Sequence, residues 1–254
     1  MRILILWLLL SFSFSLQATA FSKKDFQFAV GGQYQSILQK RGIVTYKGYQ
    51  VLPIYSIQLW NPNLLVAGSS LYYTHILVNP KHRFRLRLNL DSTLDRPLYY
   101  TSEKENERIR REETSEFDIF YEWRRSNDDH IRLQFSQDLV AHNGFYTELY
   151  FHKKLFNLLM AKNNKALLQP GVFAALGGGN KNHNEYLYGV GASHYSLTNL
   201  QYGFAVTSPS AIDVFWPTFK ITRFELLGEE NRRASYVRER EGWQVELLFA
   251  FRVL

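Results

Sequence analysis

Residues 116–124 read Glu-Phe-Asp-Ile-Phe-Tyr-Glu-Trp-Arg, a run in which polar and apolar side chains mostly alternate. One face carries Phe117, Ile119, Tyr121 and Trp123, whereas the other carries Glu116, Asp118, Glu122 and Arg124. Successive side chains of a β-strand point to opposite faces of the sheet, so this period of two predicts a strand. Aromatic residues and isoleucine also favour strands over helices.

The same alternation continues on both sides of this run. It is clearest in residues 25–38, 83–91, 131–138, 145–152, 200–207 and 244–253. Weaker strand candidates are residues 48–60, 63–77, 165–176 and 212–226. The chain is therefore predicted to be all-β and to form one domain.

Two architectures produce such alternation. A water-soluble sandwich or barrel turns its apolar face inward, whereas a transmembrane β-barrel turns it outward toward lipid. Most candidate strands are long enough for a tilted membrane crossing, which needs about 9–11 residues, whereas strands of soluble proteins mostly have about 5–6. The polar faces also carry large residues such as Tyr146 and Tyr150, as expected of a filled barrel interior. We therefore predict a transmembrane antiparallel β-barrel.

The strand number and the orientation follow from the rules of such barrels. Bacterial single-chain barrels have an even number of strands, so we expect about 12, with about 10 as the alternative and residues 184–190 as the candidate for an extra strand. Counting back from the C-terminus places residues 126–129 and 209–211 in periplasmic turns. Residues 93–114, 177–199 and 227–242 then form outer loops, which are typically longer than periplasmic turns.

Residues 1–20 have the pattern of a secretory signal peptide. Arg2 precedes a short apolar run, and Ala18-Thr19-Ala20 is a small-residue cleavage site. The apolar run is shorter than the roughly 20 residues of a spanning helix. We therefore predict cleavage before Phe21 and export of residues 21–254 as a β-barrel domain to the outer membrane of a Gram-negative cell.

The composition excludes several classes of protein. The chain of 254 residues contains no cysteine, which excludes disulfide scaffolds, thiol catalysis and thiolate metal sites. Because 46% of the residues are hydrophobic and 16% are aromatic, disorder is not expected. In an exported protein, the net charge of +7 favours lipopolysaccharide, peptidoglycan or anionic solutes as partners, and not nucleic acid.

The predicted barrel interior contains a cluster of opposite charges. Residues 83–91 and 116–124 are consecutive strands, and their polar faces carry arginines and carboxylates respectively, which support each other across an antiparallel pair. The predicted lumen cluster comprises Arg83, Arg85, Arg87, Glu116, Asp118, Glu122 and Arg132. Two hypotheses stay open: an ion-pair-lined selective channel, or a salt-bridged and largely closed interior that stabilises the barrel.

No residue is predicted to be catalytic, to bind a cofactor or to hold a metal. Asp128-Asp129-His130 is similar to an aspartate–histidine protease site, but it lies in a predicted periplasmic turn, whereas such proteases act outside the cell. His183 and His194 share a loop with Ser193 and Ser196, but no G-x-S-x-G elbow accompanies them. The histidines also lack a metal-ligand context. We therefore expect a protein that is not an enzyme.

Several motifs resemble the MipA/OmpV family of outer-membrane proteins. The main one is the segment Asn184, Glu185, Tyr186, Leu187, Tyr188, Gly189 and Val190, which follows the Pro-Gly of residues 169–172 as in the family. Residues 52–54 are similar to the early proline strand of the family, and residues 110–114 and 223–230 match two further patterns more loosely. The resemblance covers most of residues 21–254.

The resemblance implies a scaffold in the outer membrane that brings a murein lytic transglycosylase together with a bifunctional penicillin-binding synthase, and it implies no catalytic residues. Basic segments that could contact such enzymes are Lys40-Arg41, Lys153-Lys154, Lys162 and Lys165. Lipid and lipopolysaccharide would be further partners. The alternatives are a porin-like channel for ions or small solutes, and a surface protein that acts through its outer loops.

Overall fold

The computed structural model describes residues 27–59, 61, 63–90, 112–126, 129–160, 166–192, 194–208 and 215–252. The predicted signal peptide, residues 1–20, and most of the predicted outer loop 93–114 lie outside the described residues.

The described chain consists almost wholly of strands. The first half contains β1 (Gln27–Lys40), β2 (Ile43–Gln58), β3 (Leu64–Ala67), β4 (Ser70–Ile76), β5 (His82–Asn89), β6 (Glu116–Arg124) and β7 (His130–Asp138). The second half contains β8 (Phe145–Lys154), β9 (Leu159–Met160), β10 (Ala166–Gly179), β11 (Ser196–Thr207), β12 (Phe215–Leu226) and β13 (Glu241–Arg252). Two short helices, α2 (Lys181–Tyr188) and α3 (Glu229–Arg233), interrupt the strands.

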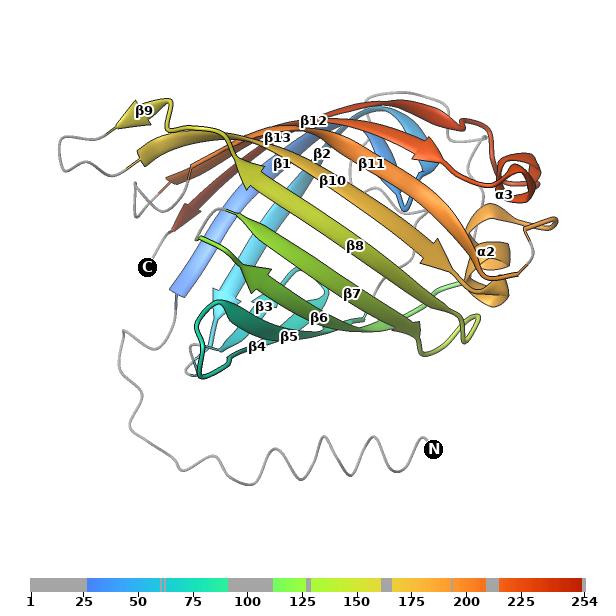
Figure 1. Cartoon of the computed structure of the whole chain (residues 1–254), viewed down its shortest axis with the longest axis horizontal. Helices are drawn as coiled ribbons and strands as arrows, with labels where there is room; N and C mark the ends of the chain where they lie inside the picture. The colour runs from blue at the N-terminus through green and yellow to red at the C-terminus, as the bar shows by residue number, and fades with distance from the viewer. Residues whose placement is uncertain are drawn as a thin grey trace, which may run out of the picture.

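The strands close into a single antiparallel barrel (Figure 1). β1 pairs with β2 on one side and with β13 on the other, and β10 pairs with both β8 and β11. β9 pairs only with β10 and extends it beyond the ring, so the closed barrel has 12 strands. This confirms the predicted fold class and the preferred strand number.

The twelfth strand is not the one that the sequence indicated. Residues 184–190 were predicted as a possible strand, and that prediction is wrong because residues 181–188 form α2. The missed strand lies instead within residues 63–77, which fold as the hairpin β3–β4 with register Val66↔Leu71. Gly68 makes the hairpin turn with a φ of 56°, a left-handed conformation that glycine adopts without a steric penalty.

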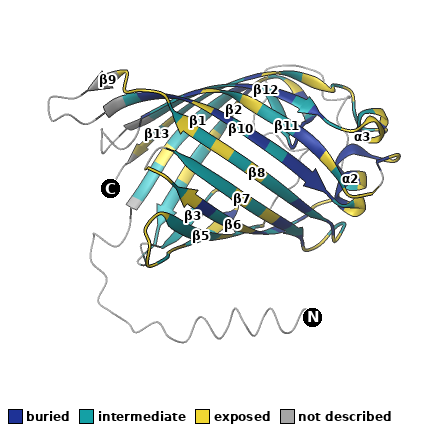
Figure 2. Ribbon diagram, in the orientation of Figure 1, coloured by how far each residue is buried: buried dark blue, intermediate teal, exposed yellow. Residues whose placement is uncertain are grey.

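The barrel is polar inside and apolar outside, as the alternation predicted. Exposed outer residues occur on nearly every strand, among them Val51, Leu86, Leu133, Phe151 and Phe249. The charged side of β6 is buried instead, with Glu116 at 3% and Asp118 at 0% exposure. Figure 2 shows this alternation along the strands.

The two ends of the barrel differ. One end, here called the helix end, carries α2, α3 and the β1–β2 turn, whereas the opposite end carries β9, the start of β1 and the end of β13 (Figure 1). Because residues 63–77 form two strands, the number of strands is even, and the start of β1 and the end of β13 lie at the same end of the barrel. Neither described helix is long and apolar enough to cross a membrane.

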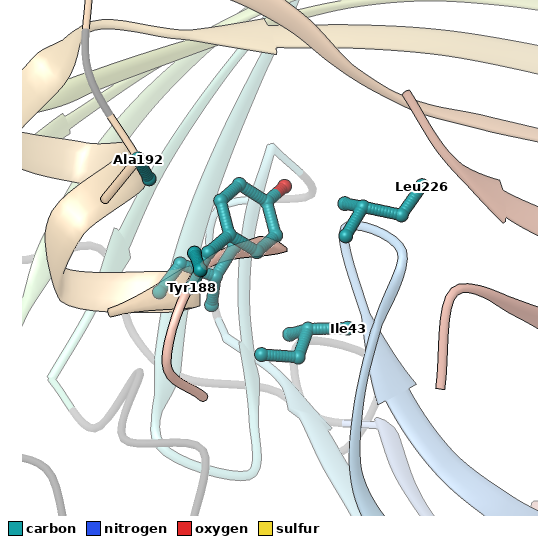
Figure 3. Packing of buried hydrophobic residues seen from close by; sticks show 6 residues of the cluster. Ile43, Tyr188, Ala192 and Leu226 are labelled. Atoms are coloured by element: carbon teal, nitrogen blue, oxygen red, sulfur yellow. The ribbon is translucent and has the colours of Figure 1, made fainter. Parts of the chain in front are cut away.

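A small apolar core lies at the helix end. It consists of Ile43, Leu187, Tyr188, Ala192, Leu226 and Ala234, with Tyr236 and Val237 packed against it. Figure 3 shows the Tyr188 ring beside Ile43 and Leu226. The start of β2, the end of β12, α2 and the β12–β13 connection therefore pack against one another at the helix end.

Candidate functional site

The predicted lumen cluster lies on one wall of the barrel interior, formed by β5, β6 and β7. The backbone register places Arg83 opposite Glu122, Arg87 opposite Asp118, and Glu122 opposite Arg132. The structure therefore brings Arg83, Arg87 and Arg132 next to carboxylates across the three strands.

Asp118 is the most deeply buried carboxylate of this wall. Its Oδ2 accepts a hydrogen bond of 2.6 Å from Arg87 Nε, and its Oδ1 accepts from Ser136 Oγ and, at 3.3 Å, from Gln134. A buried charge of this kind is stable only when it is paired and hydrogen-bonded. Arg85 instead faces Phe120 in the register and donates to Thr74 Oγ1 at 3.3 Å.

Glu116 is held by a residue that the sequence analysis did not place in the lumen. Arg41 donates to both carboxylate oxygens of Glu116, at 2.7 and 3.2 Å, which makes a two-pronged ion pair. Lys40 lies 3.5 Å from the same carboxylate. The β1–β2 turn gives Arg41 a φ of 52° and Gly42 a φ of 82°, as in tight hairpins. Lys40-Arg41 is also one of the predicted contact segments, and it lies at the helix end, where both side chains reach Glu116.

His183 of α2 lies above this ion pair and contacts Arg41. Arg41 Nη1 donates to His183 Nε2 at 2.8 Å, and Nδ1 of the same ring lies 3.2 Å from Asn184 Oδ1. His183 must therefore be neutral. Burial, reinforced by the charge of Arg41, holds the pKa of His183 well below its usual value. The ring stacks on Tyr146, and Tyr146 also lies 4.1 Å beneath the Arg41 guanidinium.

The motif that carried the family resemblance forms most of α2, which lies at the helix end and packs against Ile43 and Leu226. Asn184 is fully buried and donates to Gly179 O and His194 O, and Tyr188 donates to Arg41 O at 2.8 Å. Glu185 is exposed, and Tyr186 donates to Glu112 O and stacks on His142. We call residues 181–192 the cap.

The segment after α2 pairs with the β12–β13 connection. Val190 N donates to Ser235 Oγ at 3.0 Å, and Tyr236 N donates to Tyr188 O at 2.8 Å. Gly189 has a φ of 95°, and a Cβ there would lie 2.3 Å from Ser235 Oγ. Glycine is therefore required at this position for the close contact between the two segments.

A polar cavity of about 270 Å³ lies in the barrel interior. Its lining comes from seven strands around the barrel and from the β1–β2 turn, and it includes Arg41, Arg87, Tyr146, Glu148 and Lys220. Glutamines form a large part of its wall, and Gln50, Gln35, Gln244, Gln39 and Gln201 are hydrogen-bonded in series. The cavity offers both hydrogen-bond donors and acceptors to water or to a small solute.

Two of the histidines in these sequence motifs contact other side chains. Nε2 of His183 is held by Arg41, and His130 stacks on His152 at 5.3 Å. Asp129 Oδ1 accepts from the backbone N–H of Lys154, and Asp128 and Ser193 lie outside the described residues. Within the described part of the chain, no three histidine or carboxylate side chains are grouped as metal ligands would be.

Comparison with known proteins gives fold-level likeness only. No family model matches the chain, and no curated protein matches it. The outer membrane channel DcaP of Acinetobacter baumannii is similar at 6% identity, covering 93% of this chain and all of that chain, with a TM-score of 0.40. A bacterial polysaccharide outer membrane secretin is similar at 9% identity over 92% of this chain and all of its own, with a TM-score of 0.41.

A third similar structure is the N-terminal β-barrel domain of Pseudomonas aeruginosa OprF, at 13% identity. It covers 54% of this chain and 87% of its own, with a TM-score of 0.28. All three TM-scores are below 0.5, so the barrel fold of this chain rests on its own strand pairing.

Proposed function

We propose that this chain is an outer-membrane β-barrel that is not an enzyme and whose interior is closed. The observation that carries the proposal is the reversed distribution of its side chains. Large apolar residues are exposed around the outer face, and charged residues are buried inside. Such a surface is unfavourable in water and favourable in lipid, whose hydrocarbon covers the apolar belt.

The lengths of the connections support an orientation with the helix end at the cell surface. The three longest connections, 90–115, 180–195 and 227–240, all lie at the helix end. Connections at the opposite end are shorter, the longest being 155–165. Outer-membrane barrels have short periplasmic turns and long outer loops. Lipid and lipopolysaccharide are then the partners of the outer face.

The closed interior favours a scaffold over a transporter. The cap packs at the helix end, and two buried carboxylates of β6 are ion-paired, as in Arg87–Asp118 and Arg41–Glu116. In a barrel of this kind, function resides on the surfaces. The proposed partners at the periplasmic end are a murein lytic transglycosylase and a penicillin-binding synthase. This choice of partners rests on the motif resemblance. Lys153 is exposed near that end and remains a candidate contact.

A channel is the second candidate, and the polar cavity is the observation that favours it. Its wall mixes amides and charged groups, as a path for small polar solutes would. The cap would then have to move for solute to pass.

Conductance of the refolded chain in a planar bilayer separates the two candidates. The scaffold proposal predicts no steady openings. Steady, ion-selective openings would contradict the closed interior and favour the channel.

Crosslinking in intact cells tests the scaffold directly. A photo-crosslinker at Ser126, in the β6–β7 turn, is expected to capture murein enzymes, and one at Glu185, on the outer side of α2, serves as the control. Equal capture from both positions, or none from Ser126, would contradict the scaffold.

A further inference from the structure

Four arginines gather on the interior wall toward the end opposite α2. This arginine cluster consists of Arg83 on β5, Arg85 on β5, Arg124 on β6 and Arg132 on β7. Glu122 lies opposite both Arg83 and Arg132 in the strand register, and Arg85 and Arg124 lie two positions from Arg83 and Glu122 on the same faces of their strands. Glu122 attracts Arg83 and Arg85, whereas the neighbouring arginines repel them. Like charges this close in a partly desolvated interior require a counter-charge.

Only two described carboxylates pair with these four arginines, so the counter-charge is incomplete. Glu122 is hydrogen-bonded to Arg124, and Glu148 lies 3.3 Å from Arg132. Within the described residues, neither Arg83 nor Arg85 lies within ion-pair distance of a carboxylate. Two positive charges of the cluster therefore remain without a paired anion.

The donors of the cluster are also incompletely used. The Nε atoms of Arg83 and Arg132 are buried and have no hydrogen-bond partner among the described residues. An unsatisfied buried donor costs free energy, and a charged donor costs more. The four side chains are nonetheless partly exposed, because Arg83 and Arg85 are half-buried and Arg124 and Arg132 are 22% and 28% exposed.

We propose that the arginine cluster is a binding site for a phosphate-type dianion. Guanidinium groups match phosphate oxygens with pairs of parallel hydrogen bonds, and a phosphate monoester carries roughly two negative charges near neutral pH. Such an anion neutralises the two remaining charges and accepts hydrogen bonds from the guanidinium groups of the partly exposed side chains. Because the cluster faces the lumen and not the lipid, the ligand is free phosphate or a small phosphorylated solute.

The proposal needs only the folded barrel, so it stands or falls independently of the scaffold and of conduction. The strand register explains why the site lies on the wall formed by β5, β6 and β7. Arg83, Glu122 and Arg132 are direct neighbours across β5, β6 and β7, so Glu122 fixes Arg124 while the flanking arginines keep donors free.

Isothermal titration of the refolded full chain with inorganic phosphate, at constant chloride, tests the site. Arg83→Gln and Arg85→Gln are expected to raise the Kd for phosphate at least about tenfold, because each removes a charged donor. Arg85→Lys keeps the charge and loses the planar fork, so its Kd is expected to lie between those of wild type and Arg85→Gln. Heat-modifiable migration verifies that each variant has folded.

Lys220→Gln is the matched control, since Lys220 is an interior cation on β12 and is paired with Glu246 at 3.3 Å. It removes the same charge from the opposite wall and is expected to change the Kd by less than about twofold. No phosphate binding to wild type, an unchanged Kd in Arg85→Gln, or an equal loss in Lys220→Gln would overturn the proposal. Displacement of phosphate by soluble short-chain phosphatidylglycerol would overturn the assignment to a lumen solute in favour of a lipid headgroup.

Discussion

At the scale of single residues, the contact between Arg41 and His183 requires an uncharged imidazole. Protonation of His183 would place a second cation 2.8 Å from the Arg41 guanidinium. Glu116 is the carboxylate that faces both groups, His142 lies beside the ring, and Tyr146 stacks on it. His183 must therefore remain neutral for the cap to keep its contact with Arg41.

Stability of the barrel is predicted to fall with acidification through His183. Because the pKa of His183 is lowered by folding, the unfolded chain binds the extra proton first, so the stabilisation is complete above about pH 6.5 and is lost below it. Each pH unit below that value is expected to cost about 1.4 kcal/mol until the folded pKa is reached. Urea unfolding of the refolded chain at about pH 7.5 and about pH 5 measures the loss.

The variant His183→Gln keeps an acceptor for Arg41 but does not titrate. Its unfolding free energy is expected to change less between the two pH values than that of wild type. Burial also lowers the pKa of His142, so part of the acid sensitivity should remain in the variant. An identical pH dependence in wild type and His183→Gln would contradict this role.

The alternation of the sequence predicted which residues face the interior, but it did not predict their partners. Arg83, Arg85 and Arg87 are equivalent in the pattern, and only the strand register selects Arg87 for Asp118. Arg41 is separated from Glu116 by 75 positions, and its side chain reaches the lumen because of a turn with two positive φ values. Local sequence carries no signal for either choice.

At the scale of elements, α2 shows where a period of two misleads. Tyr186, Tyr188 and Val190 fit a strand face, but the buried residues His183, Asn184, Leu187 and Tyr188 follow a helical spacing. Asn180 accepts from His183 N as the N-cap, and Gly189 follows the last turn, so the helix signals were present in the sequence. Similarly, the two-residue turn at Gly68 was too short to interrupt the pattern of 63–77.

Gly189 and Gly191 allow a matched test of how the cap is held. Both have left-handed φ values, 95° and 103°, so alanine strains the backbone at either position by about 1–3 kcal/mol. Only at Gly189 would the new Cβ also collide, with Ser235 Oγ at 2.3 Å and with Tyr236 N at 2.9 Å. Gly189→Ala is therefore expected to detach the cap from the β12–β13 connection.

Limited proteolysis of the detergent-solubilised barrel measures this detachment. Cleavage within residues 181–192 is expected to be faster in Gly189→Ala than in Gly191→Ala by about tenfold, the ratio that corresponds to about 1.4 kcal/mol of added strain. Equal cleavage rates in the two variants would contradict the proposed contact.

At the scale of the whole molecule, closure between β1 and β13 determines whether a barrel forms at all. Gly31 lies opposite Ala250, and a Cβ at Gly31 would lie 1.9 Å from Phe249 O, whereas a Cβ at the adjacent Gly32 meets nothing within 4 Å. Gly31→Ala is expected to prevent closure and to abolish the heat-modifiable band on gels. Gly32→Ala should retain that band, and loss of it in both variants would contradict the assigned seam.

The central claim is that the barrel crosses the outer membrane with its apolar face in lipid and its helix end outside. The chain contains no cysteine, so single substitutions report position without interference. The most direct measurement is labelling of Glu185→Cys, Ser126→Cys and Leu133→Cys in intact cells with a membrane-impermeant maleimide. We predict that Glu185→Cys is labelled at once, Ser126→Cys only after the outer membrane is permeabilised, and Leu133→Cys only after denaturation. Labelling of Leu133→Cys as readily as Glu185→Cys in intact cells would contradict the account.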